Sequence, residues 1–573
     1  MSKHFPLTSS AVLLSVLLGS LLPLSTLATE QDYKVLDAFF DHSFQSRTSA
    51  LVAIPTYRSA EPTNKQTVVQ NLERVRETLK SWADTFNAGQ KTLQLEFFEW
   101  RENADDSHPW VFGFRLGNGP RKFAILTHLD TVAPGNDAWR PFQARIEKRH
   151  YRGRETDFLI GRGALDDKGP AVVSLIALEA LARNFDETDR LADFTFEVLF
   201  DTSEETDMST PAFYAQNPGA LPELGLVYDA MWTVAYEKGI ERPVFSVPLG
   251  APPASGLWIE SLETYPGPSN QIADSATAVI RGSTPALLAE FAGQVQQSYP
   301  EFGFDDPAYR KAPLTISADD HGVTLQTRVS GAQHGSAPQE NRAGGANPLV
   351  SLAGFLAHLA DTQVLAQSGI AQMVRFMAWG WGTQVFGEKH PALLARHDDI
   401  FKADNGTTYA LTRFVTDAGH AKATLEIDIR YALLHHHTRW DGRTAQTLPG
   451  NSDFAEILMS LVADFNAQSP GAAISVTTRT AVGPDLKDPR SPQFAAVLDA
   501  FAQVTGQASP ILAIGGGTDA KGHAELIAAG ALFTDKLGPP VNFHGIDEGA
   551  PIEDLRQGAR ILYQLLLNQI SPP

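Results

Sequence analysis

Five short segments of this 573-residue chain contain the residue types that bind divalent metal ions, and the sequence has no cysteine. They lie at 127–130 with His128, 161–169 with Asp166, 201–205 with Glu205, 228–230 with Asp229, and 543–548 with His544. The lack of cysteine excludes disulfides, thiolate metal sites and cysteine nucleophiles. Five ligands, one of them bridging, suffice for two metal ions that share a water. An all-nitrogen-and-oxygen ligand set favours Zn²⁺, with Mn²⁺ or Co²⁺ as alternatives.

Each segment also has an ordinary structural explanation. A histidine at a strand end, such as His128, can simply be capped by a neighbouring Asp130. The pair Asp166-Asp167 can cap a helix, and Glu204-Glu205 can be a solvated surface pair. Adjacent glutamates at a strand end point to different sides, so one can bind metal while the other acts as acid or base.

Two of these segments directly follow predicted strands. Strand-like runs at 122–126 and 194–200 end just before His128 and the Glu204-Glu205 pair. His128 and Asp130 share one side of the chain, so Asp130 can fix the second ring nitrogen of a metal-bound His128. Ligands in open α/β sheets bind beyond the carboxyl ends of the strands.

The order of predicted elements indicates an α/β catalytic domain interrupted by an inserted domain. Helices at 68–86, 169–183, 492–504 and 552–567 alternate with buried strands, which predicts a central, mostly parallel sheet with helices on both faces. Between them, strands at 323–329 and 425–433 and a helix at 285–299 predict an α+β lid domain. We therefore expect a catalytic domain at 29–240 and 486–573 and a lid at 241–485.

Charge and the N-terminus restrict partners and location. The net charge of −20 argues against nucleic-acid binding, which needs a basic surface. Lys3 and His4 precede an apolar stretch at 11–27, and the small residue Ala28 follows, which predicts a signal peptide over 1–28. The stretch is short for a bilayer span. We expect an exported protein, periplasmic or secreted, with no stable membrane association after cleavage.

The blocks HLDTV, GRGALDDKG, DTSEET, YDA and FHGIDE resemble, in the same order, those of the M20 metallopeptidases, and most closely the PepV-like dipeptidases. The resemblance implies that Asp166 bridges two metal ions and often precedes a cis peptide bond. It places His128 and Asp229 on one ion and His544 and Glu205 on the other. It also makes Glu204 the general base and Asp130 the residue that orients His128.

The resemblance extends to substrate binding. SGAQHGS contains His334, which would stabilise the oxyanion, and DIRY contains Arg430, which would contact substrate. The resemblance also places Asn270 near the site. It implies that the glycine-rich loop Gly515–Thr518, with Gly516, Gly517 and Thr518, receives the terminal carboxylate of the substrate through backbone N–H groups. Asp519, Ala520 and Lys521 depart from the family pattern after this loop, which leaves the side-chain preference open. No family block includes His435-His436-His437, and we expect a solvated loop there.

We expect a two-metal dipeptidase that hydrolyses dipeptides or very short peptides. An inserted domain of about 240 residues favours a doubled lid and a monomer. An M20 aminoacylase or carboxypeptidase acting on N-acylated amino acids is the first alternative. A catalytically inactive peptide-binding protein is the second, but all five ligand positions and Glu204 are present.

Overall fold

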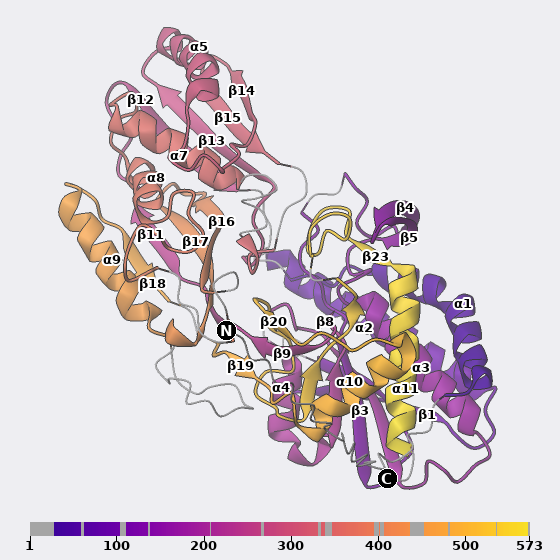
Figure 1. The fold of residues 1–573 in the computed structure, drawn as a ribbon. Coiled ribbons are helices and arrows are strands. Elements are labelled where there is room, and N and C mark those ends of the chain that lie inside the picture. The colour runs from indigo at the N-terminus through magenta and orange to yellow at the C-terminus, as the bar shows by residue number, and fades with distance from the viewer. Residues whose placement is uncertain are drawn as a thin grey trace, which may run out of the picture.

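The computed structural model describes residues 28–58, 62–102, 110–135, 138–206, 208–264, 269–329, 334–338, 347–394, 400–401, 406–435, 452–478, 482–534 and 536–570. The apolar stretch assigned to a signal peptide lies outside these residues. Two bodies are visible in Figure 1, one built from both ends of the chain and one from its middle. Within the described ranges, no helix combines the length and apolar character needed to cross a bilayer.

The catalytic domain contains a nine-stranded sheet in the order β1-β2-β6-β3-β7-β21-β9-β19, with β20 also paired to β9. Its strands are β1 (Leu95–Arg101), β2 (Trp110–Leu116), β3 (Arg121–His128), β6 (Phe194–Asp201), β7 (Leu224–Val227), β9 (Val234–Glu237), β19 (Asp485–Leu486), β20 (Leu512–Ile514) and β21 (Leu526–Ala528). Two small sheets accompany it, formed by β4 (Arg145–Tyr151), β5 (Arg154–Ile160) and β23 (Gly549–Pro551), and by β8 (Ala230–Met231) and β22 (Ala531–Leu532).

The large sheet is mixed, with a parallel centre. Strands β6, β3, β7 and β21 run parallel, whereas β1, β2 and β19 pair antiparallel with their neighbours. The sequence led us to expect a mostly parallel sheet. Consecutive strands such as β1 and β2 can pair antiparallel across a short connection without a crossover helix, which explains the difference at this edge.

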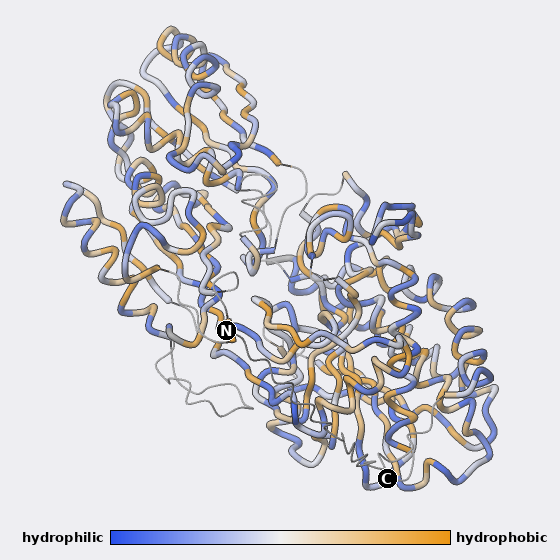
Figure 2. The backbone as a smooth tube through the Cα atoms, in the orientation of Figure 1, coloured by the Kyte–Doolittle hydropathy of each residue, from blue (hydrophilic) through white to orange (hydrophobic). Residues whose placement is uncertain are grey.

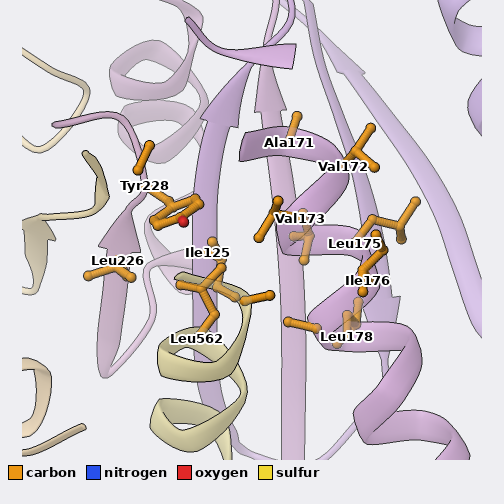
Figure 3. Packing of buried hydrophobic residues seen from close by; sticks show 14 of the residues in the cluster. Ile125, Ala171, Val172, Val173, Leu175, Ile176, Leu178, Leu226, Tyr228 and Leu562 are labelled. Atoms are coloured by element: carbon orange, nitrogen blue, oxygen red, sulfur yellow. The ribbon is translucent and has the colours of Figure 1, made fainter. Parts of the chain in front are cut away.

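Helices cover both faces of this sheet, as the sequence predicts. They are α1 (Glu30–Val52), α2 (Pro62–Asn87), α3 (Lys168–Phe185), α4 (Ser209–Gln216), α10 (Pro492–Thr505) and α11 (Ile552–Ile570). Helix α3 packs between α1, α11 and the sheet. Figure 3 shows its apolar residues, Val173 and Ile176 among them, beside Ile125 of β3 and Leu562 of α11. On the opposite face, Phe213 of α4 packs in a separate cluster with residues of β2, β3 and β6.

Among the described residues, the inserted lid domain has two sheets and four α-helices. One sheet has the order β12-β13-β15-β14, and the other has the order β10-β17-β11-β18 with β16 beside β17. The elements are β10 (Gly239–Glu241), β11 (Val244–Pro248), β12 (Leu257–Thr264), β13 (Ser275–Gly282), α5 (Pro285–Glu301), β14 (Leu314–Ala318), β15 (Val323–Arg328), α7 (Pro348–Asp361), α8 (Gly369–Gly380), β16 (Thr408–Thr416), β17 (Lys422–Tyr431), α9 (Phe454–Gln468) and β18 (Ser475–Thr477). One hydrophobic cluster spans both sheets.

Strand β17 shows how the lid presents polar groups to the rest of the protein. Its odd-numbered residues, such as Ile427 and Ile429, belong to the hydrophobic core of the lid. Asp428 and Arg430 alternate with them and face the other way, because successive side chains of a strand point to opposite sides. Figure 2 shows hydrophilic and hydrophobic residues mixed along the lid, and hydrophobic stretches gathered inside the catalytic domain.

The chain passes from one domain to the other between β9 and β10 and returns between β18 and β19. The first passage lies between Glu237 and Gly239, and the second between Thr477 and Asp485. The domain boundaries that we expect from the sequence, at 240/241 and 485/486, stay predictions.

Candidate metal centre and substrate site

The parallel strands of the catalytic sheet end beside a buried group of histidines and carboxylates. His128 is the last residue of β3, Glu205 follows β6, and Asp229 follows β7. Asp166 comes from the loop before α3, and His544 from the loop before β23. These five residues, which the sequence puts far apart, lie close together because neighbouring parallel strands end at one edge of the sheet.

Asp166 lies between the two histidines, with one carboxylate oxygen near each. His128 Nε2 is 2.9 Å from Asp166 Oδ1 and 3.7 Å from Asp229 Oδ2. His544 Nε2 is 2.5 Å from Asp166 Oδ2 and 3.1 Å from Glu205 Oε1. The peptide bond between Asp166 and Asp167 is cis. The individual roles of these residues stay predictions.

The unsatisfied donor atoms of this group fit metal ions. Asp166 Oδ2 and Glu205 Oε1 are buried, and both lie against the single Nε2 atom of His544 without an aligned hydrogen bond. The possible ligand atoms of His128, Asp166 and Glu205 lie within 4.8 Å of one another, as do those of His128, Glu204 and Asp229. Several buried carboxylates that share two imidazole rings are incompletely neutralised, and bound cations remove that cost. Imidazole and carboxylate ligands suit Zn²⁺ and its divalent neighbours.

The pKa values of these buried groups also favour bound metal ions. Burial, together with neighbouring carboxylates, raises the pKa of Glu204 and of Asp229 well above the usual range. Burial also raises the pKa of Glu205. For His544, burial acts to lower the pKa, but Glu205 and Asp166 raise it to about 10. Several carboxylates thus compete for protons in one small buried space, and divalent cations would relieve that competition.

Glu548 holds the loop that carries Asp166, a role that we did not predict from the sequence. Its Oε1 accepts backbone N–H groups from Gly163 at 2.9 Å, Leu165 at 3.1 Å and Asp166 at 3.3 Å. Its Oε2 accepts from the buried guanidinium of Arg162. Three backbone donors and one counterion fix this loop, so Glu548 positions Asp166 through the backbone of the loop.

Asp130 contacts both His128 and the tandem glutamates. His128 Nδ1 lies 3.1 Å from the Asp130 carbonyl oxygen and 3.5 Å from its carboxylate. The Asp130 carboxylate accepts the backbone N–H of Glu204 at 3.0 Å and of Glu205 at 3.2 Å. Arg58 lies 3.5 Å from the same carboxylate. Asp130 is therefore placed to orient the two glutamates as well as the imidazole.

The lid brings His334 to the metal-binding group. The rings of His334 and His544 have centroids 4.7 Å apart. Burial, with the positive charges of His544 and Arg430, holds the pKa of His334 well below its usual value, so the ring is neutral. The backbone N–H of Ser336 donates to His334 Nδ1 at 3.1 Å. The Ser336 hydroxyl lies 2.6 Å from the same nitrogen and can donate to it as well. With Nδ1 as the acceptor of these contacts, we assign the proton of the neutral ring to Nε2.

The lid also contacts the glycine-rich loop of the catalytic domain. Arg430 donates to Asp428 through Nε at 2.6 Å and Nη2 at 3.0 Å, and through Nη1 to the Gly515 carbonyl oxygen at 3.0 Å. A Cβ atom on Gly515 would lie 2.5 Å from the Ser336 carbonyl oxygen, so this close approach requires glycine. In this structure the lid closes onto the site.

The groups predicted to bind substrate differ in whether they already have partners within the protein. The hydroxyl and backbone N–H of Thr518 both donate to Glu237, at 2.8 and 3.3 Å, so both donors are used within the protein. Gly516 and Gly517 are half-buried, and their N–H groups bind no other described residue. Asn270 is buried, and its Oδ1 has no hydrogen-bond partner.

The prediction of a solvated loop at 435–437 is wrong for His435, the first of these residues. His435 is buried, its Nδ1 lies 2.8 Å from the Thr407 hydroxyl, and its ring packs against Phe454. His436 and His437 lie outside the described residues. A histidine run is hydrophilic in isolation, but Phe454 of α9 supplies an apolar surface that the local sequence does not reveal.

Known proteins resemble this chain in sequence and fold. A Staphylococcus saprophyticus protein named "putative dipeptidase" is 25% identical over 424 residues, which cover 73% of this chain and 77% of that protein. A Staphylococcus aureus protein of the same name is 24% identical over 428 residues, with the same coverage.

Among solved structures, human carnosine dipeptidase 1 has a TM-score of 0.52 at 13% identity, covering 95% of this chain and all (100%) of that one. The dipeptidase Dug1p of Saccharomyces cerevisiae has a TM-score of 0.51 at 14% identity, covering 95% of this chain and 98% of that one. At these identities the likeness shows a common fold. The profile of peptidase family M20/M25/M40 matches residues 124–568, and the chain therefore belongs to this family of peptide-bond hydrolases.

Proposed function

We propose that this protein is a two-metal dipeptidase that cleaves dipeptides or very short peptides. The observation that carries the proposal is the contact of the lid residue His334 with His544 in the metal-binding group. Residues of both domains meet at the site, which favours a substrate short enough to be held between them. The names of the staphylococcal relatives, and the fold shared with two dipeptidases, support a short substrate.

His128, Asp166 and Asp229 would hold one divalent ion, and His544, Asp166 and Glu205 the other. Bound ions of this kind supply Lewis-acid activation of the attacked carbonyl and of the attacking water. We propose Zn²⁺, with Mn²⁺ or Co²⁺ as alternatives, because the ligands are imidazoles and carboxylates.

The remaining chemistry belongs to side chains of this chain. Glu204 accepts the proton of the attacking water and passes it to the leaving amine, for which a carboxylate with a raised pKa is suited. The Nε2–H of neutral His334 donates to the oxygen of the carbonyl as negative charge develops there. Arg430, Asn270 and the N–H groups of Gly516 and Gly517 line the position of the substrate carboxylate.

The assay that separates this proposal from its main rival compares two substrate classes. Purified protein would be given neutral dipeptides and the corresponding N-acetylated amino acids, and the released amino acids would be quantified. The proposal expects cleavage of the dipeptides, with kcat/KM at least tenfold above that for the acetylated compounds. Preferential cleavage of acetylated amino acids would identify an aminoacylase, and binding without cleavage would identify an inactive peptide-binding protein.

We further propose that the enzyme is exported and acts as a monomer. The apolar stretch at 11–27 supports export, with cleavage near Ala28. The origin of His334 supports the monomer, because the lid of the same chain brings this residue to the site. N-terminal sequencing of protein from the periplasm or the medium tests the first point. Light scattering of the purified enzyme tests the second.

A further inference from the structure

Arg242 lies between strands β10 and β11 of the lid, directly across from Asp428 of β17. Strands β10 and β11 pair with β17 in one continuous register, with Ile240 opposite Arg430 on one side of Arg242 and Val244 opposite Glu426 on the other. The same register places Arg242 opposite Asp428. Side chains at directly opposed positions emerge on the same face of a sheet, with Cβ atoms about 5 Å apart.

That face is the one turned toward the substrate site. Ile240 reaches the glycine-rich loop, since its Cδ1 would lie 3.1 Å from a Cβ atom on Gly517. Arg430, opposite Ile240, donates to the Gly515 carbonyl oxygen. A Cβ atom on Gly335, beside His334, would lie 3.1 Å from Asp428 Oδ2. Arg242 therefore shares a face with residues that contact the glycine-rich loop of the catalytic domain and the His334 segment of the lid.

Arg242 has no counterion among the described residues, unlike the other guanidinium groups near the site. Arg430 is paired with Asp428, Arg162 with Glu548, and Arg58 with Asp130. The Nε of Arg242 is buried without a hydrogen-bond partner. The nearest carboxylate across the sheet, that of Asp428, already accepts two hydrogen bonds from Arg430.

Arg242 is half-buried, and its buried Nε without a partner is unfavourable; an anion bound to the guanidinium would supply the missing partner. Burial, and to a lesser degree the charge of Arg430, lowers the pKa of Arg242 from its usual value, while Asp428, Glu205 and Glu204 oppose this. Arg242 in turn helps to lower the pKa of His334. These couplings place Arg242 within the electrostatic field of the catalytic residues.

We propose that Arg242 is a specificity-determining residue that binds a carboxylate of the substrate. This inference rests on the proposed dipeptidase function. The carboxylate is either the C-terminal one of the dipeptide or that of an aspartate or glutamate side chain. Guanidinium groups match both, because their N–H donors fit a carboxylate in a bidentate geometry. Arg430, already engaged by Asp428 and Gly515, then acts with Arg242 rather than alone.

The test measures kcat and KM of the metal-loaded enzyme for a neutral dipeptide, its C-terminal amide and a glutamate-containing analogue. For Arg242→Gln we expect a loss in kcat/KM of about 10- to 100-fold, mainly through KM, on substrates that carry the recognised carboxylate. The amide would be spared if the C-terminal carboxylate is the partner. The neutral dipeptide would be spared if the side-chain carboxylate is the partner. Arg242→Lys keeps the charge and should recover part of the loss.

The matched control is Arg490→Gln. Arg490 is exposed and paired with Asp488 on the surface, so this variant should leave kcat/KM unchanged for all three substrates. An equal loss on all three substrates, or values within twofold of wild type on all three, would overturn the assignment. If Arg242→Gln does not fold, the same substrate pattern in Arg242→Lys decides. Wild-type enzyme that cleaves none of the three would refute the proposed function instead, so the two failures are distinguishable.

Discussion

The imidazole rings of His334 and His544 lie edge to face, with centroids 4.7 Å apart and an interplanar angle of 67°. One ring comes from the inserted lid and the other from the last part of the catalytic domain. Their contact joins the two domains at the metal-binding group. It also places a neutral histidine, which has a proton to donate from Nε2, beside one of the metal-ligand candidates.

The His334→Ala variant should fold and bind metal like the wild type but lose about 10²–10³-fold in kcat, because one donor to the developing oxyanion is gone. Circular dichroism and metal analysis would check the first part, and steady-state kinetics the second. A kcat within twofold of wild type would show that His334 only packs in the lid.

The two adjacent glutamates should respond differently to the same substitution. Glu204→Gln cannot accept the proton of the water, so kcat should fall about 10²–10⁴-fold while metal content stays near that of wild type. Glu205→Gln removes a charged ligand candidate, so metal content should fall first, and added metal should partly restore activity. Identical behaviour in metal titrations, or exchanged behaviour, would contradict this assignment of roles.

Glu548→Gln should destabilise the protein although Glu548 is not a ligand candidate. The substitution leaves Arg162 buried without its counterion, and breaking such a pair costs about 3–5 kcal/mol. We expect a lower free energy of unfolding and reduced metal content, because the loop that carries Asp166 loosens. Glu553→Gln, an exposed glutamate a few residues further on, serves as the control and should change stability by less than about 0.5 kcal/mol. Equal unfolding curves for the two variants would refute this positioning role.

The sequence predicted the residues of the site better than it predicted their supports. His128, Glu205 and Asp229 stand in or beside recognisable strand ends, and parallel strands gather their ends at one edge, whereas Asp166 stands at the entrance of a recognisable helix. Glu548 lies within the FHGIDE block and Arg242 in no block, and neither role could be predicted, because each depends on partners far away in the sequence. The same holds for the sheet, since β19, β20 and β21 have two or three residues each and give no periodicity.

Lys168 should make stability depend on pH. It is buried, and its Nζ donates to the carbonyl oxygens of Leu51 at 3.1 Å and Ile54 at 2.7 Å. Burial lowers its pKa from 10.5 to about 7. Between these values the unfolded chain binds the extra proton and the folded chain does not, so the free energy of unfolding rises with pH across this window.

Urea titrations of wild type and Lys168→Met test this dependence. The free energy of unfolding of wild type, relative to the variant, should rise from about pH 7 to about pH 9, by up to about 1.4 kcal/mol per pH unit. Taking the difference from the variant removes the pH effects of all titratable groups that the two proteins share. A difference that stays flat or falls over this range would show that Lys168 keeps its proton in the folded state.

The most direct test of the whole account is hydrolysis of a neutral dipeptide by enzyme from which metal has been removed, with metal content measured by elemental analysis. The account predicts no activity after chelation, and return of activity as Zn²⁺, Mn²⁺ or Co²⁺ is added back, up to two ions per chain. Full activity in protein shown to be free of metal would contradict the two-metal centre formed by His128, Asp166, Glu205, Asp229 and His544.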